Sequence, residues 1–244
     1  MGNDFFRFKQ FTIYHDRCAM RVGTDSVLIG SWTEISGVST ILDIGSGTGV
    51  IAIMMAQRTN AKIDTIEIDK DAFKQTQENI ARCPWPKRIN AYHSSVQDYV
   101  KTSTKKYNRI ISNPPYFENS LKPGSEKRAL SRHAGSLTGN QLIDSAIELL
   151  LPNGKFALIY PYEQHKNFIA MAIRKGLFCI RITEVFSTIK NPPFRAMMEF
   201  SQIPEKCEVS QLCIYNEKMN GYTEDYQKLT SDFYLQWPEI HSGS

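Results

Sequence analysis

The tetrapeptide Asn113-Pro114-Pro115-Tyr116 combines groups that could hold a planar amino group for reaction. An aromatic amine such as N6 of adenine is a weak nucleophile, because its lone pair is delocalised into the ring. The side-chain oxygen of Asn113 and the carbonyl oxygen of Pro114 could each accept a hydrogen bond from one amine N–H. The two bonds would turn the nitrogen lone pair toward an electrophile. The prolines stiffen the loop, and Tyr116 could stack on the base. Taken alone, the tetrapeptide would also fit a proline-stiffened turn with an exposed tyrosine.

A second candidate feature is the glycine turn Asp43-Ile44-Gly45-Ser46-Gly47-Thr48-Gly49, which follows an apolar run. Glycines let the backbone turn tightly and approach a ligand closely. The dinucleotide pattern G-x-G-x-x-G does not fit, because Val50 follows Gly49. The acid Asp43 would repel a pyrophosphate but attract a cationic amine, such as the ammonium of a methionine moiety.

A second acid, Glu67, ends the next predicted strand and could accept hydrogen bonds from two ribose hydroxyls. Either acid alone would fit a solvated charge at a strand end. Together with the glycine turn, they favour S-adenosylmethionine over a nicotinamide dinucleotide as the ligand. Ser95 or Asp98 could contact the adenine amino group of that ligand, and the backbone amide of Val96 could contact its ring nitrogen.

Short apolar runs that alternate with helical stretches place these motifs at the ends of strands. We predict strands at residues 40–44, 62–68, 88–92, 109–112, 155–160, 178–186 and 196–201, and helices at 50–58, 70–81, 138–150 and 162–175. Pro152-Asn153-Gly154 predicts a turn between a helix and the fifth strand. The last two strands should be antiparallel, because residues 187–195 leave no room for a crossover helix. The predicted fold is α/β: a doubly wound, mostly parallel, Rossmann-like sheet of seven strands with one antiparallel strand.

Composition adds few restrictions. The chain of 244 residues, with a net charge of +4, could form one large domain, and we expect residues 1–244 to do so. Residues 40–206 would be its core, with extensions at 1–39 and 207–244. The five cysteines are scattered without metal-ligand spacing, so we expect neither a metal site nor a disulfide framework. We see no membrane-spanning run or signal peptide and expect a cytoplasmic protein.

A second tetrapeptide, Asn191-Pro192-Pro193-Phe194, looks like a copy of the first. It lies between the last two predicted strands, away from the position that a catalytic loop would take. We therefore assign it to substrate contact or to structure rather than to catalysis.

With these motifs in place, the chain resembles the class I S-adenosylmethionine-dependent methyltransferases. More closely, it resembles the bacterial tRNA1(Val) (adenine(37)-N6)-methyltransferases, which carry the Asn-Pro-Pro-Tyr motif. The resemblance runs nearly end to end, through residues 8–11, 15–25, 112–117, 129–133, 222–226, 229–230 and 232–235. It implies methylation of the adenosine immediately 3′ of the anticodon in a valine tRNA.

The resemblance also implies roles for individual residues. Thr24 and Asp25 would close over the methionine end of the cofactor, and Asn113, Pro114 and Tyr116 would hold the target base. Ser95 departs from the family, which has an aspartate at that point. The full predicted cofactor set is Thr24, Asp43, Gly45, Ser46, Gly47, Glu67, Ser95, Val96 and Asn113.

An RNA partner also suits the distribution of basic residues. The segment 117–137 carries several basic side chains and could form a basic lid beside the site. The predicted substrate contacts are Pro115, Tyr116, Lys127, Arg128 and Arg132. Arg7, Lys9, Arg17 and Arg21 could extend this face, although most such charges are simply solvated. We expect a monomer that binds tRNA and needs no obligate protein partner.

Four alternatives remain open from the sequence. A protein glutamine-N5 methyltransferase could use the same tetrapeptide, but the first 39 residues leave little room for a separate recognition domain. An adenine methyltransferase acting on DNA would need an inserted domain for base readout, which we do not see. A nucleotide-binding oxidoreductase would need a proton-transfer residue, for which we find no candidate. A non-enzymatic RNA-binding module would leave the glycine turn, Glu67 and Asn113 without a shared explanation.

Overall fold

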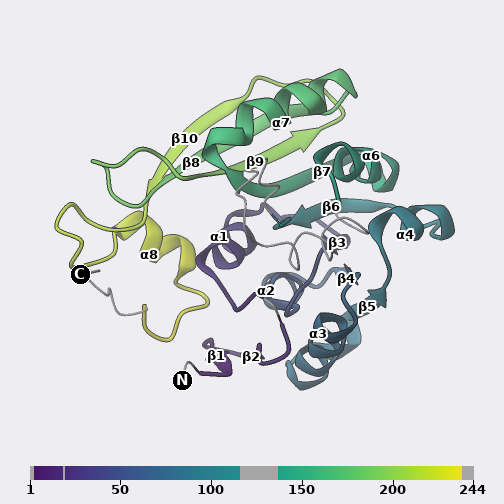
Figure 1. The fold of residues 1–244 in the computed structure, drawn as a ribbon, viewed down its shortest axis with the longest axis horizontal. Helices are drawn as coiled ribbons and strands as arrows, with labels where there is room; N and C mark the ends of the chain where they lie inside the picture. The colour runs from purple at the N-terminus through teal and green to yellow at the C-terminus, as the bar shows by residue number, and fades with distance from the viewer. Residues whose placement is uncertain (1–2, 19, 116–136, 238–244) are drawn as a thin grey trace, which may run out of the picture.

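A single eight-stranded sheet dominates the fold of the computed structural model, which describes residues 3–18, 20–115 and 137–237 (Figure 1). The strand order across the sheet is β10-β8-β9-β7-β6-β3-β4-β5. The strands are β3 (Thr40–Ile44), β4 (Lys62–Glu67), β5 (Ile89–His93), β6 (Tyr107–Ser112), β7 (Leu150–Pro161), β8 (Phe178–Phe186), β9 (Arg195–Ser201) and β10 (Glu208–Cys213).

Helices cover both faces of this sheet, as expected for a doubly wound fold (Figure 1). Neighbouring residues of one strand therefore enter different cores: Ile41 belongs to one buried apolar cluster and Leu42 to the other. Both faces are apolar, which is why the strands are nearly continuously hydrophobic. The helices of the core are α2 (Val50–Arg58), α3 (Lys70–Arg82), α4 (Val96–Thr102), α6 (Gly139–Leu149) and α7 (Tyr162–Arg174), with a short 3-10 turn at Pro86–Arg88.

The predicted antiparallel strand is confirmed. β9 runs antiparallel to both β7 and β8, whereas the other neighbouring pairs in the sheet are parallel. The predicted number of seven strands is one too low, because β10 adds to β8 at the edge of the sheet. Most of β10 is exposed, so it lacks the apolar run that marks the other strands.

The predicted turn at Pro152-Asn153-Gly154 is wrong as a separator of helix and strand, because these residues lie inside β7 as an irregularity of its ladder. The ladder with β6 passes from the pair Tyr107–Leu150 to the pair Arg109–Lys155, so the intervening residues of β7 bulge out. A Cβ on Gly154 would lie 2.7 Å from the carbonyl oxygen of Tyr107. This close approach of two backbones requires glycine at that point.

The N-terminal and C-terminal extensions pack together beside the sheet. The hairpin of β1 (Phe5–Arg7) and β2 (Thr12–Tyr14) lies next to the C-terminal segment, where Phe8 and Tyr234 form an isolated bridge. Helices α1 (Thr24–Trp32) and α8 (Glu224–Thr230) pack on each other, and α1 also packs on α2. Side chains of both extensions join the same apolar cluster as α2 and β3.

Among the residues that the structure describes, no helix is long and apolar enough to cross a membrane. The same part of the chain contains no group of three or more His, Cys, Asp or Glu residues placed to hold a metal ion.

Candidate active site

A cavity of about 370 Å³ lies at the carboxyl ends of β3 and β6. Four stretches of chain line it. They are residues 20–21 and 23–26, the glycine turn with the start of α2, Asn113-Pro114-Pro115, and Phe194 from the second tetrapeptide. Parallel strands bring their carboxyl ends to one edge of the sheet, where ligands of open α/β sheets bind. The fold thus brings Asn113-Pro114-Pro115, the glycine turn and Phe194 to one cavity.

The glycine turn leaves open space in front of its backbone. Gly45 and Gly47 have φ angles of +81° and +53°, which side-chain-bearing residues rarely adopt. A Cβ at either position would meet nothing within 4 Å, so the turn presents bare backbone to the cavity. Gly49 (φ +80°) is different, because a Cβ there would lie 3.1 Å from Thr76 of α3.

Helix α3 fixes the shape of this turn from behind. The Thr76 hydroxyl donates to the carbonyl oxygen of Gly47 at 2.8 Å and lies 3.0 Å from the Ser46 hydroxyl. The Asn79 side-chain amide donates to the carbonyl oxygen of Thr48 at 2.9 Å. These bonds satisfy backbone groups that the irregular turn cannot pair with itself.

Glu67 sits where the sequence predicts it, at the end of β4, but it does not line the cavity. One carboxylate oxygen accepts from the backbone N–H of Gly47 at 2.7 Å, and the other accepts from Asp69 at 2.9 Å. Each carboxylate oxygen can accept a further hydrogen bond. Glu67 therefore braces the glycine turn and keeps acceptor capacity for a ligand hydroxyl.

Asp43 lies beneath the turn and is completely buried. One of its oxygens has only the Thr65 hydroxyl at 3.3 Å, and the other has no hydrogen-bond partner among the described residues. The pKa of Asp43 is raised to about 7, mainly by burial and also by the neighbouring charge of Glu67, against the lowering effects of the Thr65 hydroxyl and the Ala52 backbone. A carboxyl group in this state would gain from a nearby cation.

The Asn113 side chain reaches the cavity from the end of β6. Its Nδ2 donates to the hydroxyl of Ser26 at 3.1 Å, and Pro114 and Pro115 line the cavity beside it. Tyr116 lies outside the described residues, as do Lys127, Arg128, Arg132 and the rest of the predicted basic lid. Their predicted roles are not tested by the structure.

Thr24 lines the cavity from the first turn of α1. Asp25 beside it accepts a hydrogen bond from Nε of Arg195 at 3.0 Å. Arg195 also donates to the carbonyl oxygen of Phe194 at 3.0 Å. The second tetrapeptide thereby contributes its aromatic ring to the cavity, while Asn191 is exposed and donates to Ser187 at 2.8 Å.

Ser95 and Val96 do not line the cavity. Ser95 is the N-cap of α4: its hydroxyl accepts from the backbone N–H of Asp98 at 3.0 Å and donates to the Asp98 carboxylate at 2.7 Å. The two residues that could contact an adenine are therefore bonded to each other. A ligand would have to share the Ser95 or Asp98 side chain with this cap.

Several residues of the cavity wall were not expected there from the sequence. Met20, Arg21, Gly23 and Ser26 precede the predicted core; the first three fall within the family resemblance at residues 15–25 without an assigned role in the cavity, and Ser26 carries no motif. These residues reach the cavity wall because α1 and the segment before it pack against the core, an arrangement that the sequence pattern does not indicate. Phe194, which belongs to the second tetrapeptide, also lines the cavity.

Sequence comparisons connect the chain to known methyltransferases. The family profile described as methyltransferase small domain matches residues 25–175. A protein of Trichodesmium erythraeum (strain IMS101) named tRNA1(Val) (adenine(37)-N6)-methyltransferase is 44% identical over 97% of this chain and 100% of its own length. A protein of the same name from Parabacteroides distasonis is 43% identical over 97% of this chain and 100% of its own length.

Comparison of structures gives the same fold. A crystal structure described as a predicted O-methyltransferase from Agrobacterium tumefaciens matches with a TM-score of 0.69, at 16% identity, over 86% of this chain and 96% of that chain. The tRNA m1G37 methyltransferase of M. jannaschii matches with a TM-score of 0.58, at 18% identity, over 83% of this chain and 57% of that chain. At these identities the matches establish the Rossmann-like methyltransferase fold alone.

Proposed function

The chain belongs to the tRNA1(Val) (adenine(37)-N6)-methyltransferase family, and from that membership we propose how its cavity carries out the reaction. The enzyme is a tRNA (adenine-N6)-methyltransferase. We propose that its methyl donor is S-adenosylmethionine and that its target is adenosine 37, beside the anticodon of a valine tRNA. The residues that carry these roles are part of the same proposal.

Three observations support the fit of S-adenosylmethionine. The cavity of about 370 Å³ lies within the range of small-molecule sites. Bare backbone at Gly45 and Gly47 leaves room for close approach by the methionine end, next to Thr24 and Ser46. The unpartnered oxygen of Asp43 would gain from the nearby ammonium group, and Glu67 has capacity for ribose hydroxyls. Bound S-adenosylmethionine would supply an electrophilic methyl group on a sulfonium sulfur.

The adenine end of the cofactor would reach past Glu67 toward the start of α4. There the backbone amide of Val96 and the hydroxyl of Ser95 are the proposed contacts, with Asp98 as the partner that Ser95 already holds. The exposed side chain of Ile68, which follows Glu67, could pack on the adenine ring.

Asn113 and Pro114 perform the central step in this proposal. Oδ1 of Asn113 and the carbonyl oxygen of Pro114 each accept a hydrogen bond from one N–H of the adenine N6 amine. This arrangement directs the nitrogen lone pair out of conjugation and makes it available for attack. When bound, S-adenosylmethionine would supply the methyl carbon for the new nitrogen–carbon bond and would keep the electron pair of the broken sulfur–carbon bond on its sulfur. The methylated nitrogen then releases one proton to solvent, so the site needs no strong general base.

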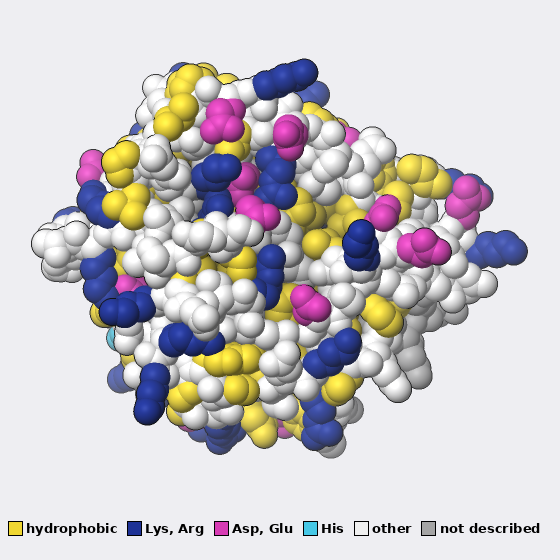
Figure 2. Space-filling view, turned by 180° about the vertical axis from the view of Figure 1, so that it is seen from behind, with side chains coloured by type: hydrophobic (Ala, Val, Ile, Leu, Met, Phe, Trp, Pro, Cys, Tyr) yellow, Lys and Arg dark blue, Asp and Glu magenta, His cyan; other side chains and the backbone are white. Residues whose placement is uncertain are grey.

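The target base must leave its stack to enter the cavity, as in other enzymes that act on a base. Pro115, Phe194 and Tyr116 are the proposed walls around it, and Phe194 already lines the cavity. Lys127, Arg128 and Arg132 are the proposed phosphate contacts. On the face shown in Figure 2, Lys and Arg side chains predominate over Asp and Glu along the lower edge, which suits a polyanionic partner.

The proposal includes the organisation and setting of the protein. It is one domain with a core at residues 40–206, and it acts as a cytoplasmic monomer without a metal ion. The packing of both extensions on one apolar cluster with the core supports the single domain.

The observation that carries this proposal is the shared cavity: Asn113 and the glycine turn face the same space. The test uses purified protein, radiolabelled S-adenosylmethionine and tRNA that lacks the modification, followed by nucleoside mass spectrometry. We expect N6-methyladenosine beside the valine anticodon. Loss of a preorganised polar contact predicts that Asn113→Ala reduces transfer by at least about 10²-fold.

Asn191→Ala is the matched control, because Asn191 heads the second tetrapeptide and bonds only to Ser187 through its side chain in the described structure. It should retain most of the activity. Equal losses at both positions would contradict the assignment of Asn113 as the catalytic residue. Label that appears in a protein of the extract while tRNA stays unlabelled would indicate a glutamine-amide methyltransferase instead.

A further inference from the structure

The first turn of α1 touches both loops that form the cavity. Two consecutive residues make these contacts: Asp25 accepts from Arg195 at 3.0 Å, and Ser26 accepts from Asn113 at 3.1 Å. Neither contact is apparent from the sequence, since Ser26 and Asn113 are 87 positions apart. The N-terminal extension therefore reaches the residue to which we assign the central chemical role.

The hydrogen bond to Ser26 holds the Asn113 side chain in place at the cavity. An amide carries a donor at Nδ2 and an acceptor at Oδ1, and only the acceptor can take a hydrogen bond from an amine. Nδ2 is directed at the Ser26 hydroxyl, and Oδ1 has no hydrogen-bond partner among the described residues, so it can accept from the target amine. A side chain displaced from this position would lose the geometry that transfer needs.

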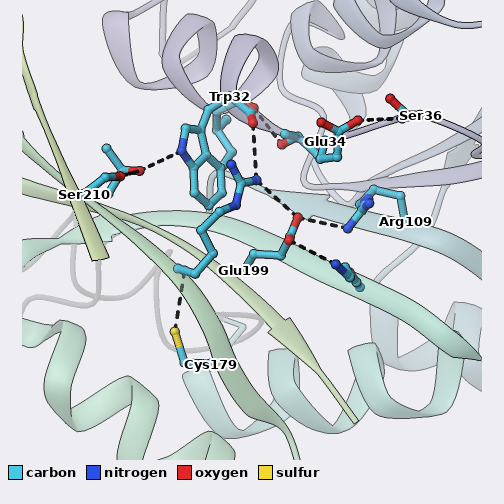
Figure 3. A network of polar contacts seen from close by, with 12 residues as sticks. Trp32, Glu34, Ser36, Arg109, Cys179, Glu199 and Ser210 are labelled. Atoms are coloured by element: carbon cyan, nitrogen blue, oxygen red, sulfur yellow. Dashed lines mark hydrogen bonds and ion pairs between the residues drawn. The ribbon is translucent and has the colours of Figure 1, made fainter. Parts of the chain in front are cut away.

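Ser26 can do this only if α1 is held firmly. Trp32 fixes the C-terminal end of α1, because its indole nitrogen donates to the Thr183 hydroxyl at 2.8 Å. Figure 3 shows Trp32 within this network. The guanidinium of Arg181 lies 3.6 Å from the centroid of the Trp32 ring and pairs with Glu199. The buried carboxylate of Glu199 also pairs with Arg109 at 3.0 Å.

The packing of α1 between these anchors is equally close. Residues from Val27 to Trp32 are all buried. A Cβ on Gly30 would lie 2.7 Å from the sulfur of Met54, so α1 and α2 pack closely at this point and a larger residue would have to displace the Met54 side chain. With both ends bonded and the middle packed, the hydroxyl of Ser26 has a fixed position relative to β6.

We propose that Ser26 is a positioning residue for methyl transfer, acting through Asn113 by holding its side chain in the position that faces the target amine. This inference rests on the proposed function, in which Oδ1 of Asn113 accepts a hydrogen bond from the target amine. Ser26 itself contacts neither the reacting nitrogen nor the methyl group in this arrangement. Its effect should therefore appear in the rate of transfer rather than in binding.

The test compares Ser26→Ala with the matched control Ser31→Ala. Ser31 lies on the same helix, and its buried hydroxyl has no hydrogen-bond partner among the described residues. One lost hydrogen bond predicts that Ser26→Ala lowers the single-turnover rate, at saturating S-adenosylmethionine and unmodified tRNA, by roughly 3- to 10-fold. Ser31→Ala should keep the wild-type rate.

Binding readouts separate positioning from other roles. The Kd for S-adenosylmethionine, measured by calorimetry without tRNA, and the KM for tRNA should both stay within about twofold of wild type in Ser26→Ala. A rise in that Kd with an unchanged saturated rate would make Ser26 a cofactor contact and overturn the inference. An unchanged rate and unchanged Kd would overturn it as well.

A double-mutant cycle shows whether Ser26 acts through Asn113. With enzyme in excess, adding Ser26→Ala to Asn113→Ala should cause no further loss of rate. If the two losses multiply, Ser26 acts independently and the inference is wrong, while the proposed function stands. If Asn113→Ala alone transfers methyl groups at the wild-type rate, the proposed role of Asn113 is wrong.

Discussion

Asp43 is the residue whose environment has the clearest pH dependence. Its pKa rises from 3.8 to about 7, mainly because burial disfavours the charged form. The neutral carboxyl therefore fits the folded state better than the carboxylate does. Stability from this group is fully present below the unfolded pKa and is lost as pH rises through the folded pKa.

The variant Asp43→Asn should remove this dependence, because an amide of nearly the same shape does not ionise in this range. We expect the stability of Asp43→Asn relative to wild type to increase between about pH 5 and about pH 8. Urea unfolding of both proteins at the two pH values measures the difference. A difference that is the same at both pH values would show that Asp43 is already ionised at the lower one.

Single residues of the candidate site could be predicted where a local sequence motif indicates their chemical role. Asn113, Gly45 and Gly47 were predicted from residue types and order, and the structure places all three at one cavity. Ser26 and Phe194 could not be assigned in this way, because their roles depend on distances across the fold. A serine in a helix has no local signature until its partner Asn113 lies 3.1 Å away.

Among the elements, α3 links the glycine turn to the N-terminal extension. The buried side chain of Asn79 donates to carbonyl oxygens of Tyr14 and Thr48 and accepts from the backbone N–H of Tyr14 at 3.0 Å. All of its hydrogen-bonding groups are thus engaged with backbone from two distant segments. Such buried groups are costly to leave unpaired.

Replacing Asn79 with Ala should therefore cost more than the loss of one hydrogen bond. We expect a loss of about 2–4 kcal/mol in unfolding free energy, from backbone groups left without partners. The affinity for S-adenosylmethionine should also fall, because Thr48 belongs to the glycine turn. Denaturant unfolding and calorimetry measure the two effects.

Gln77→Ala is the matched control for Asn79→Ala. Gln77 lies two residues earlier on the same helix and is exposed. Surface substitutions of this kind change stability by about 0.5 kcal/mol or less. Similar losses for both variants would mean that the helix itself, rather than the bridge from Asn79, sets the stability.

The alternation of strands and helices in the core was predictable, whereas α1, α4 and β10 were not. Apolar runs, separated by residues typical of turns, predict the strands and helices of the core. Helix α1 is buried over most of its surface and contains Gly30, so it shows no polar face and carries a residue of low helix propensity. β10 is largely exposed and joins the sheet through backbone hydrogen bonds to β8.

For the whole molecule, the β1–β2 hairpin and the segment around Tyr234 lie side by side beside the core. The backbone N–H of Lys9 donates to the carbonyl oxygen of Phe233 at 2.8 Å, and Phe8 and Tyr234 stack with centroids 6.1 Å apart. Helix α8 then packs on α1, which carries Ser26. The C-terminal segment is thereby connected to the active site through two layers of packing.

This connection predicts that a core substitution in the hairpin destabilises the entire protein. Phe8 is 2% exposed and packs against Phe6, Phe11 and Tyr234. Removing such a side chain costs about 3–5 kcal/mol, so Phe8→Ala should lower the stability by that amount. If the chain is one cooperative domain, the far-ultraviolet dichroism and the tryptophan fluorescence should still change together on unfolding.

Phe5→Ala provides the comparison, because Phe5 lies on the same hairpin but is 38% exposed. Its loss should cost about 1–2 kcal/mol, less than that of Phe8, because more than a third of the Phe5 side chain is already exposed. The informative outcome is the shape of the Phe8→Ala transition. Two separate transitions, with only the first shifted by the substitution, would mean that the extensions fold as a unit apart from residues 40–206. A single shifted transition would instead make the hairpin, α1 and the sheet one cooperative structure, in which packing at Phe8 helps to hold Ser26 against Asn113.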